Sequence, residues 1–91
     1  LSRPDIHLVH CCTPNDAHHE FLLAALKAGK HIYCDKPLTR TVAEAEEIFA
    51  LAQTLPDVRH RMTFNYRFAP ATMRAKQLID DGFLGEVYQF R

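Results

Sequence analysis

Glycine is scarce in this chain of 91 residues, and so are long apolar runs. The three glycines, Gly29, Gly82 and Gly85, cannot form a Gly-x-Gly-x-x-Gly or P-loop motif, so the chain lacks a phosphate cradle of its own. The longest apolar run, from Phe21 to Leu26, has six residues, whereas a helix needs about 20 to span a bilayer. These two absences exclude a self-contained phosphate loop and a membrane-spanning helix.

An excess of charge of either sign is also missing. Eleven Lys and Arg balance eleven Asp and Glu, so the net charge is zero with histidine neutral. This balance gives no electrostatic reason to expect a nucleic acid or an anionic membrane as partner. Hydrophobic residues make up 47% and charged residues 24%, which is typical of a soluble globular protein rather than a disordered one.

Metal-binding motifs are absent, because neither an HExxH motif nor paired CxxC motifs occur. Cys11 and Cys12 are adjacent, so on a strand they point to opposite faces and are poorly placed to share a metal. His18 and His19 diverge by about 100° on a helix. We therefore expect no metal site, and we interpret the three cysteines, which include Cys34, as buried reduced thiols of a cytoplasmic protein.

The alternation of short apolar segments with helical ones predicts an α/β fold. The first segment is apolar enough for a strand that is buried on both faces. The connections are too long for hairpins, which favours parallel strands joined by right-handed crossovers, as in half of a doubly wound nucleotide-binding sheet. The predicted strands are 5–12, 30–34 and 61–66, and the predicted helices are 16–28 and 41–55.

Local signals place the ends of these helices. Thr13 or Asn15 can cap the first helix, and Gly29 stands where a left-handed C-terminal cap is needed. Thr41 and Glu44 have the spacing of a capping box at the start of the second helix. The expected apolar stripe of the first helix is Ala17, Phe21, Ala24, Ala25 and Ala28.

The character of the sequence changes after Phe68. Pro70 opens a third helix that is predicted to reach Asp81, with Gly82 as its stop signal. Residues 86–91 then alternate with period two, as a strand of a one-sided sheet does. The predicted domains are residues 1–68 and residues 69–91. Because the chain starts without Met or a signal peptide and stops inside the last alternating run, we expect a piece of a larger protein that is inactive alone.

Polar side chains follow each of the three predicted parallel strands. Ligands of such sheets bind outside the carboxyl ends of the strands, so segments 13–15, 35–37 and 65–67 are expected to converge on one crevice. Lys36 is the strongest candidate, because a lysine in a crevice can trade a proton with a substrate hydroxyl. Its alternative role is a surface lysine paired with Asp35.

The neighbours of Lys36 each have two interpretations. Asp35 orients Lys36 or accepts a hydrogen bond from a ribose hydroxyl, or it is a solvated turn acid. Arg67 clamps a phosphate or carboxylate, or it forms an interdomain salt bridge. Asn15 bonds a ligand or caps the helix, and His18 is the one histidine close to the crevice.

Several motifs in register resemble the Gfo/Idh/MocA oxidoreductase family, which includes glucose–fructose oxidoreductase and inositol dehydrogenase. The resemblance covers nearly the whole chain. It rests on Cys12-Thr13-Pro14-Asn15-x-x-His18, Ala25-Leu26-Lys27-Ala28-Gly29-Lys30-His31, Cys34-Asp35-Lys36-Pro37-Leu38, Asn65-Tyr66-Arg67-Phe68-x-Pro70 and Leu84-Gly85-Glu86-Val87.

The resemblance implies a fold and a set of roles. The chain would be the second half of a doubly wound parallel Rossmann sheet, followed by the start of an α/β C-terminal domain with a mostly antiparallel sheet. Asp35-Lys36-Pro37 matches the family's Glu-Lys-Pro motif with a shorter acid, and Lys36 inherits the catalytic position. The family's usual catalytic Asp and His would lie beyond Arg91. The implied cofactor contacts are Thr13, Pro14, Asn15, His18, Asp35, Lys36, Pro37 and Arg67.

The resemblance also implies a function. We expect an NAD(P)-dependent dehydrogenase of a sugar, polyol or related hydroxy compound, with NAD or NADP as cofactor and a homo-oligomer as the full-length form. Two alternatives stay open: a cofactor-binding regulator without turnover on the same fold, and a glycosidase that uses NAD transiently. The sequence after Arg91 distinguishes the regulator, and the reaction products distinguish the glycosidase.

Overall fold

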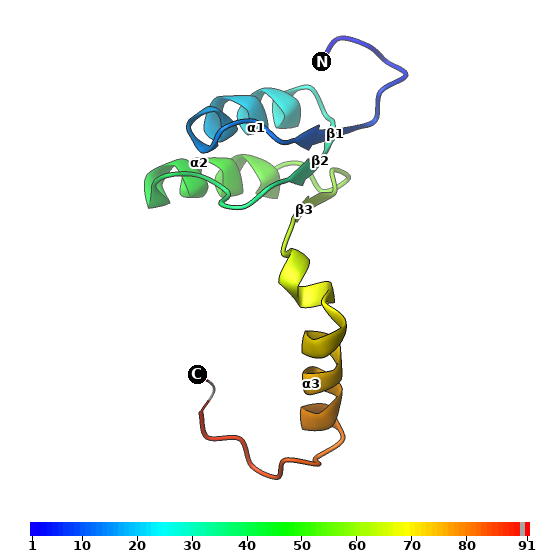
Figure 1. Cartoon of the computed structure of the whole chain (residues 1–91). Coiled ribbons are helices and arrows are strands. Elements are labelled where there is room, and N and C mark those ends of the chain that lie inside the picture. Colours follow the sequence, from blue (N-terminus) through cyan, green and yellow to red (C-terminus); the bar gives the residue numbers. More distant parts are fainter. Residues whose placement is uncertain (90) are drawn as a thin grey trace.

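The structure, a computed structural model, describes residues 1–89 and 91 and has two parts, a layered α/β unit and a helical extension (Figure 1). The elements follow one another along the chain as strand, helix, strand, helix, strand and helix, with two short 3-10 turns (η). Their bounds are β1 Leu8–Cys11, η1 Asn15–Ala17, α1 His18–Lys27, β2 His31–Cys34, α2 Val42–Gln53, β3 His60–Met62, η2 Asn65–Phe68 and α3 Pro70–Asp80.

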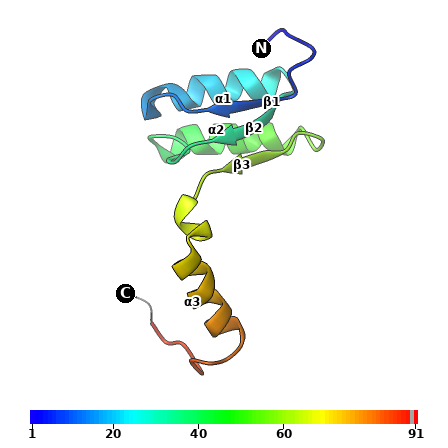
Figure 2. The ribbon, with the colours of Figure 1, turned by 45° about the vertical axis from the view of Figure 1, so that its right-hand side comes forward.

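The three strands form one parallel sheet in the order β1-β2-β3, which confirms the predicted parallel α/β topology. Cys11 of β1 pairs with Cys34 of β2, and Cys34 pairs with Met62 of β3, so the carboxyl ends of the strands lie side by side. Both α1 and α2 cover the same face of the sheet (Figure 2). This follows from two successive right-handed crossovers that move in the same direction across the sheet.

Only the face of the sheet under the helices is buried, which corrects the expectation for the first strand. Leu8 and Tyr33 are exposed on the open face, while Cys11, Ile32 and Cys34 are buried against the helices. The period-two alternation of a strand explains this pattern, because one face has a cover and the other has none. The prediction that all three cysteines are buried was wrong for Cys12, which is exposed. All three are unpaired thiols, as expected.

The capping signals were predicted with mixed success. The capping box is confirmed: Thr41 Oγ1 accepts the Glu44 N–H at 3.3 Å, and the Glu44 carboxylate accepts the Thr41 N–H at 3.2 Å. Gly29 has φ +67°, as a left-handed cap requires. Neither Thr13 nor Asn15 caps α1, because Asn15 opens the 3-10 turn η1 and the helix proper begins later, at His18.

The buried stripe of α1 also differs from the expected alanine stripe. It consists of His18, Leu22, Ala25 and Leu26. Burying two leucines removes more apolar surface from water than burying alanines, so the leucine face packs on the sheet. The core is completed by residues of the strands and of α2: Cys11, Ile32, Cys34 and Ile48.

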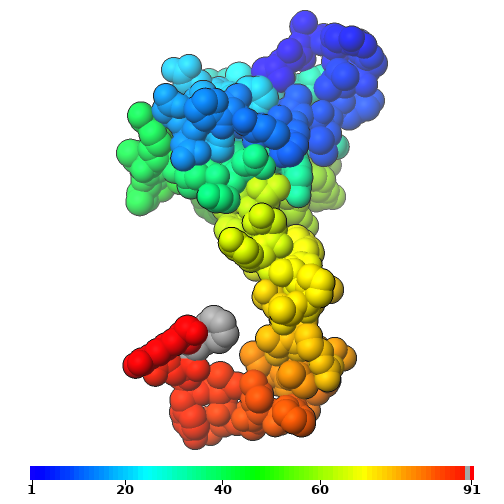
Figure 3. Space-filling model, in the orientation of Figure 1, coloured from blue at the N-terminus to red at the C-terminus, as the bar shows by residue number. Residues whose placement is uncertain are grey.

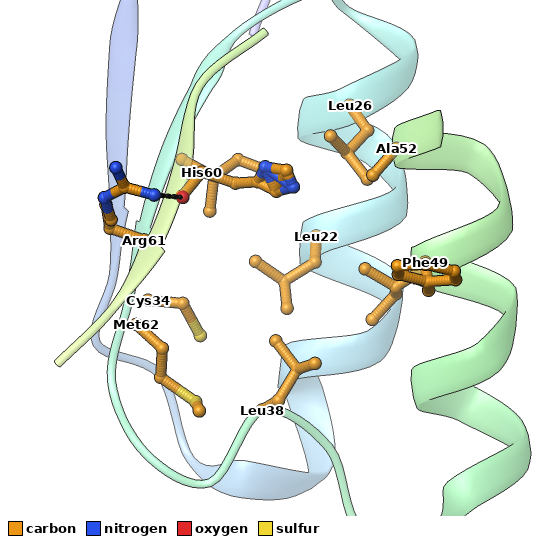
Figure 4. Close-up of a pocket in the computed structure, with 11 residues that line it drawn as sticks. Leu22, Leu26, Cys34, Leu38, Phe49, Ala52, His60, Arg61 and Met62 are labelled. Atoms are coloured by element: carbon orange, nitrogen blue, oxygen red, sulfur yellow. Dashed lines mark hydrogen bonds between the residues drawn. The ribbon is translucent and has the colours of Figure 1, made fainter. Parts of the chain in front are cut away.

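An apolar cavity of about 230 Å³ lies between the sheet and α2. Figure 4 shows Leu22, Leu38, Phe49 and Met62 around it, while the Arg61 side chain lies on the other side of β3. Its lining is almost entirely hydrocarbon and sulfur, so it offers few groups for a polar ligand. The polar residues predicted to act are not in this cavity.

Residues 69–91 do not contain the antiparallel sheet that we expected. The helix α3 is present from Pro70 to Asp80, and Gly82 follows with φ +73°. Residues 86–89 form no strand, Phe90 lies outside the described residues, and every strand pair in the described part of the chain is parallel. The alternating pattern alone cannot make a strand, because an extended segment needs a partner to pair with.

The extension that begins at η2 leaves the layered unit as an arm (Figures 1 and 3). The predicted third strand is therefore shorter than expected, since Asn65 to Phe68 turn into a 3-10 helix instead of continuing β3. No residue of α3 is buried. Among residues 1–89 and 91, no helix has the length and apolar character needed to cross a membrane.

Candidate functional site

A polar cleft of about 260 Å³ opens at the carboxyl ends of β2 and β3. Asp35 and Lys36 line it from the segment after β2, and Thr63 and Asn65 line it from the segment after β3. Parallel pairing brings these segments together, because it places all strand ends at one edge of the sheet. Two of the three predicted segments thus reach one cleft, although Arg67 is exposed on η2 and does not line it.

Asp35 is held at the edge of this cleft by two hydrogen bonds. Its Oδ1 lies 3.2 Å from His10 Nε2 and accepts the Thr63 hydroxyl at 3.0 Å. These two hydrogen bonds hold the pKa of the Asp35 carboxyl below its ordinary value. The bond with His10 is the larger cause, and the bond with Thr63 is the second. Asp35 therefore stands ionised in a fixed orientation rather than free in solvent.

Lys36 makes no ion pair or hydrogen bond through its ammonium group within residues 1–89 and 91. The neighbouring carboxylate is bonded to His10 and Thr63, so the alternative role of Lys36 as the partner of Asp35 is not what the structure has. The side chain is exposed and lines the cleft. Its ammonium group is therefore available to a molecule that enters the cleft. The peptide bond from Lys36 to Pro37 is cis.

The segment after β1 lies next to the cleft through its contacts with the segment after β2. The Asp35 N–H donates to the Cys11 carbonyl at 3.0 Å, which extends the strand pairing to the cleft residue. Thr13 is half-buried, and its hydroxyl lies 3.4 Å from Cys11 Sγ. Pro14 and Asn15 are exposed in the connection between β1 and α1.

His18 lies beneath this edge and is completely buried. Its Nδ1 is 2.8 Å from the Pro37 carbonyl oxygen, and its Nε2 is 2.9 Å from the Thr13 carbonyl oxygen. The ring therefore connects the segments that follow β1 and β2. Contact of His18 with a cofactor, as the sequence predicted, stays a prediction.

Sequence reasoning missed two members of the site, Thr63 and His10. Thr63 bonds both the Asp35 carboxylate and, at 3.2 Å, the Cys34 carbonyl, so it joins the ends of β2 and β3. The sequence could have indicated Thr63, because Thr63, like Asn65, comes soon after the third strand. His10 required the strand register, because only the pairing of Cys11 with Cys34 shows that His10 lies near Asp35.

Two groups of potential metal ligands also come together, each with ligand atoms within 4.8 Å of one another. In the buried group, both nitrogens of His18 already face carbonyl oxygens, and burial raises the pKa of the Cys34 thiol to about 12. Neutral thiols are poor ligands, so this chemistry does not favour a metal there. The two groups are Cys11, His18 and Cys34, and His10, Cys12 and Asp35.

With this geometry established, comparison with protein families gives a clear result. The model of the Gfo/Idh/MocA group, described as an oxidoreductase family with an NAD-binding Rossmann fold, matches residues 1–61. The chain belongs to this family. The match covers β1 and β2, ends within β3 and stops before η2, so this family match rests on the layered unit and not on the arm.

Similar proteins of the Gfo/Idh/MocA family include sugar and inositol dehydrogenases. Levoglucosan dehydrogenase of Pseudarthrobacter phenanthrenivorans is 43% identical over 91 residues, which are 100% of this chain and 23% of that protein. Inositol 2-dehydrogenase of Rhizobium meliloti is 38% identical over 85 residues, covering 91% of this chain and 25% of that protein. The chain thus spans about a quarter of the length of these relatives.

Solved structures of the family have the same fold. A levoglucosan dehydrogenase in complex with NADH and levoglucosan matches with a TM-score of 0.86 and 42% identity, over 93% of this chain and 23% of that one. Myo-inositol 2-dehydrogenase from Lactobacillus plantarum matches with a TM-score of 0.86 and 25% identity, over 91% and 24% of the two chains.

Proposed function

We propose that the full-length protein transfers hydride between a nicotinamide dinucleotide, NAD or NADP, and a sugar, polyol or related hydroxy compound. The observation that carries this proposal is the cleft at the strand ends, where Lys36 has no bonded partner among the described residues and Asp35 is fixed. The family membership supports the cofactor class. The levoglucosan and inositol dehydrogenases among the relatives support the substrate class.

The cleft residues fit a nicotinamide cofactor in their chemistry. Asp35 uses Oδ1 for His10 and Thr63, while Oδ2 makes no hydrogen bond within residues 1–89 and 91. This free oxygen suits a ribose hydroxyl, and the Asn65 amide at the cleft suits another polar group of the cofactor. The remaining proposed contacts are Thr13, Pro14 and Asn15 after β1, Pro37 after β2, and Arg67 on η2. His18, the buried first residue of α1, would act through the Thr13 and Pro37 carbonyls that it faces.

Oxidation of an alcohol removes a hydride from carbon and a proton from oxygen. The bound nicotinamide supplies the hydride acceptor, and the protein must then manage only the proton. Lys36 Nζ is the group in the cleft that can hydrogen-bond the substrate hydroxyl, and as the neutral amine it would accept the hydroxyl proton and become the ammonium as the carbonyl forms. In the reverse direction, Lys36 returns that proton to the oxygen.

The organisation of the whole protein follows from the same proposal. The boundary between residues 1–68 and 69–91 is supported by the absence of buried residues in α3. The unpaired thiols suit a reducing compartment, which supports a cytoplasmic enzyme. A homo-oligomer is the expected full-length form.

The decisive experiment is a titration of the full-length protein with NADH and NADPH, followed by nicotinamide fluorescence. We expect saturable binding of at least one nucleotide, followed by turnover on myo-inositol, levoglucosan or a glucoside. Absence of binding to both nucleotides would refute the proposal. Binding without turnover of any of these compounds, or of further sugars and polyols, would instead favour a non-catalytic regulator, and release of a hydrolysed sugar would favour a glycosidase.

Lys36→Ala in the full-length protein tests the assigned proton carrier. We expect turnover to fall by about 10²- to 10⁴-fold, the usual contribution of a general acid or base, with a much smaller change in NADH affinity. Lys30→Ala is the matched control, because Lys30 bonds the Arg3 carbonyl at 2.9 Å, at the opposite ends of the strands. Turnover that is equal in both variants would remove Lys36 from the mechanism.

A further inference from the structure

His18 has an unusual pair of hydrogen-bond partners for a histidine. It is the first residue of α1 and is 0% exposed, and it is the one buried polar side chain in the described part of the protein. Both of its ring nitrogens face backbone carbonyl oxygens, Nδ1 that of Pro37 at 2.8 Å and Nε2 that of Thr13 at 2.9 Å. Both distances are those of good hydrogen bonds.

The two carbonyl partners determine how many protons the ring carries. A carbonyl oxygen can only accept, so each of these bonds requires an N–H on the histidine. A neutral imidazole has one N–H and can satisfy only one of the two carbonyls. The imidazolium form has two and satisfies both, whereas an unprotonated nitrogen facing a carbonyl oxygen at these distances would bring two acceptors together.

The charged groups around the ring are compatible with an imidazolium. From β2, the Cys34 thiol lies 3.6 Å from Nδ1 and stays neutral, because its pKa is raised to about 12. The Asp35 carboxylate follows β2 and bonds His10 and Thr63 rather than His18. Glu47 of α2 bonds the neighbouring His19 at 2.8 Å instead of His18.

Two effects oppose a cation at this place. Complete burial removes the ring from water, which disfavours its charged form. The N-terminus of α1 carries the positive end of the helix dipole, which disfavours a positive charge on its first residue. Hydrogen bonds from a charged donor are about twice as strong as neutral ones, and two of them act against both effects. The acceptor oxygen at each ring nitrogen is what points to the imidazolium.

The two carbonyls belong to the two connections that border the cleft. Thr13 follows β1, and Pro37 is the residue after Lys36, so the ring fixes the backbone next to the proposed proton carrier. We propose that His18 is a positioning residue of the dehydrogenase, which as a doubly protonated ring ties the Thr13 and Pro37 carbonyls together and thereby sets the place of Lys36. The effect on Lys36 rests on the proposed function, whereas the protonation of the ring does not.

Nitrogen NMR on the full-length wild-type protein, labelled in its histidine rings, tests the protonation directly. We expect two N–H signals for His18 at neutral pH, one on each ring nitrogen, assigned by their loss in His18→Gln. His19, whose ring bonds Glu47 alone among the described residues, is the internal reference. One unprotonated nitrogen in the His18 ring would overturn the proposal, and this measurement requires no substrate.

Chemical rescue tests the positioning role in His18→Gly. The variant is expected to lose about 100-fold in turnover on the best substrate of the screen, as a displacement of about 1 Å in catalytic geometry does. Two isomers of identical size are then added. 4-Methylimidazolium has two N–H groups and replaces the whole side chain, whereas 1-methylimidazolium, seated with its methyl group at the Cβ position, has an N–H only where Nε2 stood.

We expect 4-methylimidazole to restore at least about tenfold more turnover than 1-methylimidazole, because tenfold corresponds to one hydrogen bond of ordinary strength. Equal rescue by the two isomers would show that the bond to Pro37 does not matter and would overturn the positioning role. His19→Gly with the same additives is the matched control and should respond to neither. If wild-type protein binds no nucleotide, the proposed function fails, while the NMR result for His18 still stands or falls by itself.

Discussion

The layered unit and the arm use similar kinds of residues but bury them very differently. Every buried residue among residues 1–89 and 91 lies between Cys11 and Ile48, whereas α3 has none. Both parts contain amphipathic helices, so helical pattern does not explain the difference. The sheet does, because it gives α1 a flat apolar surface, whereas η2 is the one element that α3 contacts in the described part of the chain. A helix of this chain therefore buries side chains where the sheet, or a helix that lies on the sheet, is beside it.

The largest expected effect is the loss of stability when a buried side chain of the layered unit is shortened, compared with an exposed side chain of the arm. Leu22 is 1% exposed, so Leu22→Ala in the full-length protein should lower the free energy of unfolding by about 2–5 kcal/mol, the usual cost of a cavity. Met73 of α3 is 56% exposed, and Met73→Ala should change it by no more than about 0.5 kcal/mol. Urea unfolding measures both. A large loss for Met73→Ala would contradict the comparison, since it would mean that the rest of the protein covers α3.

A smaller effect is expected from the capping box of α2. Thr41→Ala removes the hydroxyl that accepts the Glu44 N–H, and the loss should be about 1 kcal/mol in the free energy of unfolding. Thr72→Ala is the control, because Thr72 is exposed inside α3 and caps nothing. Equal losses in the two variants would show that the cap bond contributes nothing beyond the threonine itself.

The smallest effect is the shifted titration of Asp35 in the layered unit. Its pKa is lowered in the folded state, so its ionised form stabilises the fold above the ordinary pKa of about 4, and this contribution is lost as the pH falls through the lower folded value. Carboxyl-carbon NMR should find a pKa for Asp35 below its ordinary value. His10→Ala should raise the pKa further than Thr63→Ala, because the bond with His10 is the larger cause. The reverse order would mean that Thr63 is the main support of the carboxylate.

Features set by neighbouring residues were predicted well from the sequence. Thr41 and Glu44 form their capping box, and Gly29 and Gly82 end helices with positive φ, because each depends only on a few adjacent residues. The parallel order of the strands also followed from the alternation of elements. The parallel order also predicted that Lys36 and Asn65 line one cleft, because parallel strands end at the same edge of the sheet.

Features set by distant residues were not predicted. Alanine spacing suggested one face for α1, but contact with the sheet selected the face of His18 and Leu22. Residues 86–89 alternate like a strand and remain without one, because pairing requires a partner that the pattern does not contain. His10 was missed as a partner of Asp35 for the same reason, since only the register of β1 on β2 shows their proximity.

The distribution of the three thiols makes the chain its own reporter of unfolding. Cys12 is exposed, whereas Cys11 and Cys34 are buried in the core. A thiol-reactive dye should therefore modify the folded chain once, and a second and third time only when the sheet separates from α1. The number of dyes attached per molecule then counts open molecules without any engineered label. The single dye on Cys12 would also stand one residue from Thr13, close enough to the strand edge to sense a nucleotide arriving there.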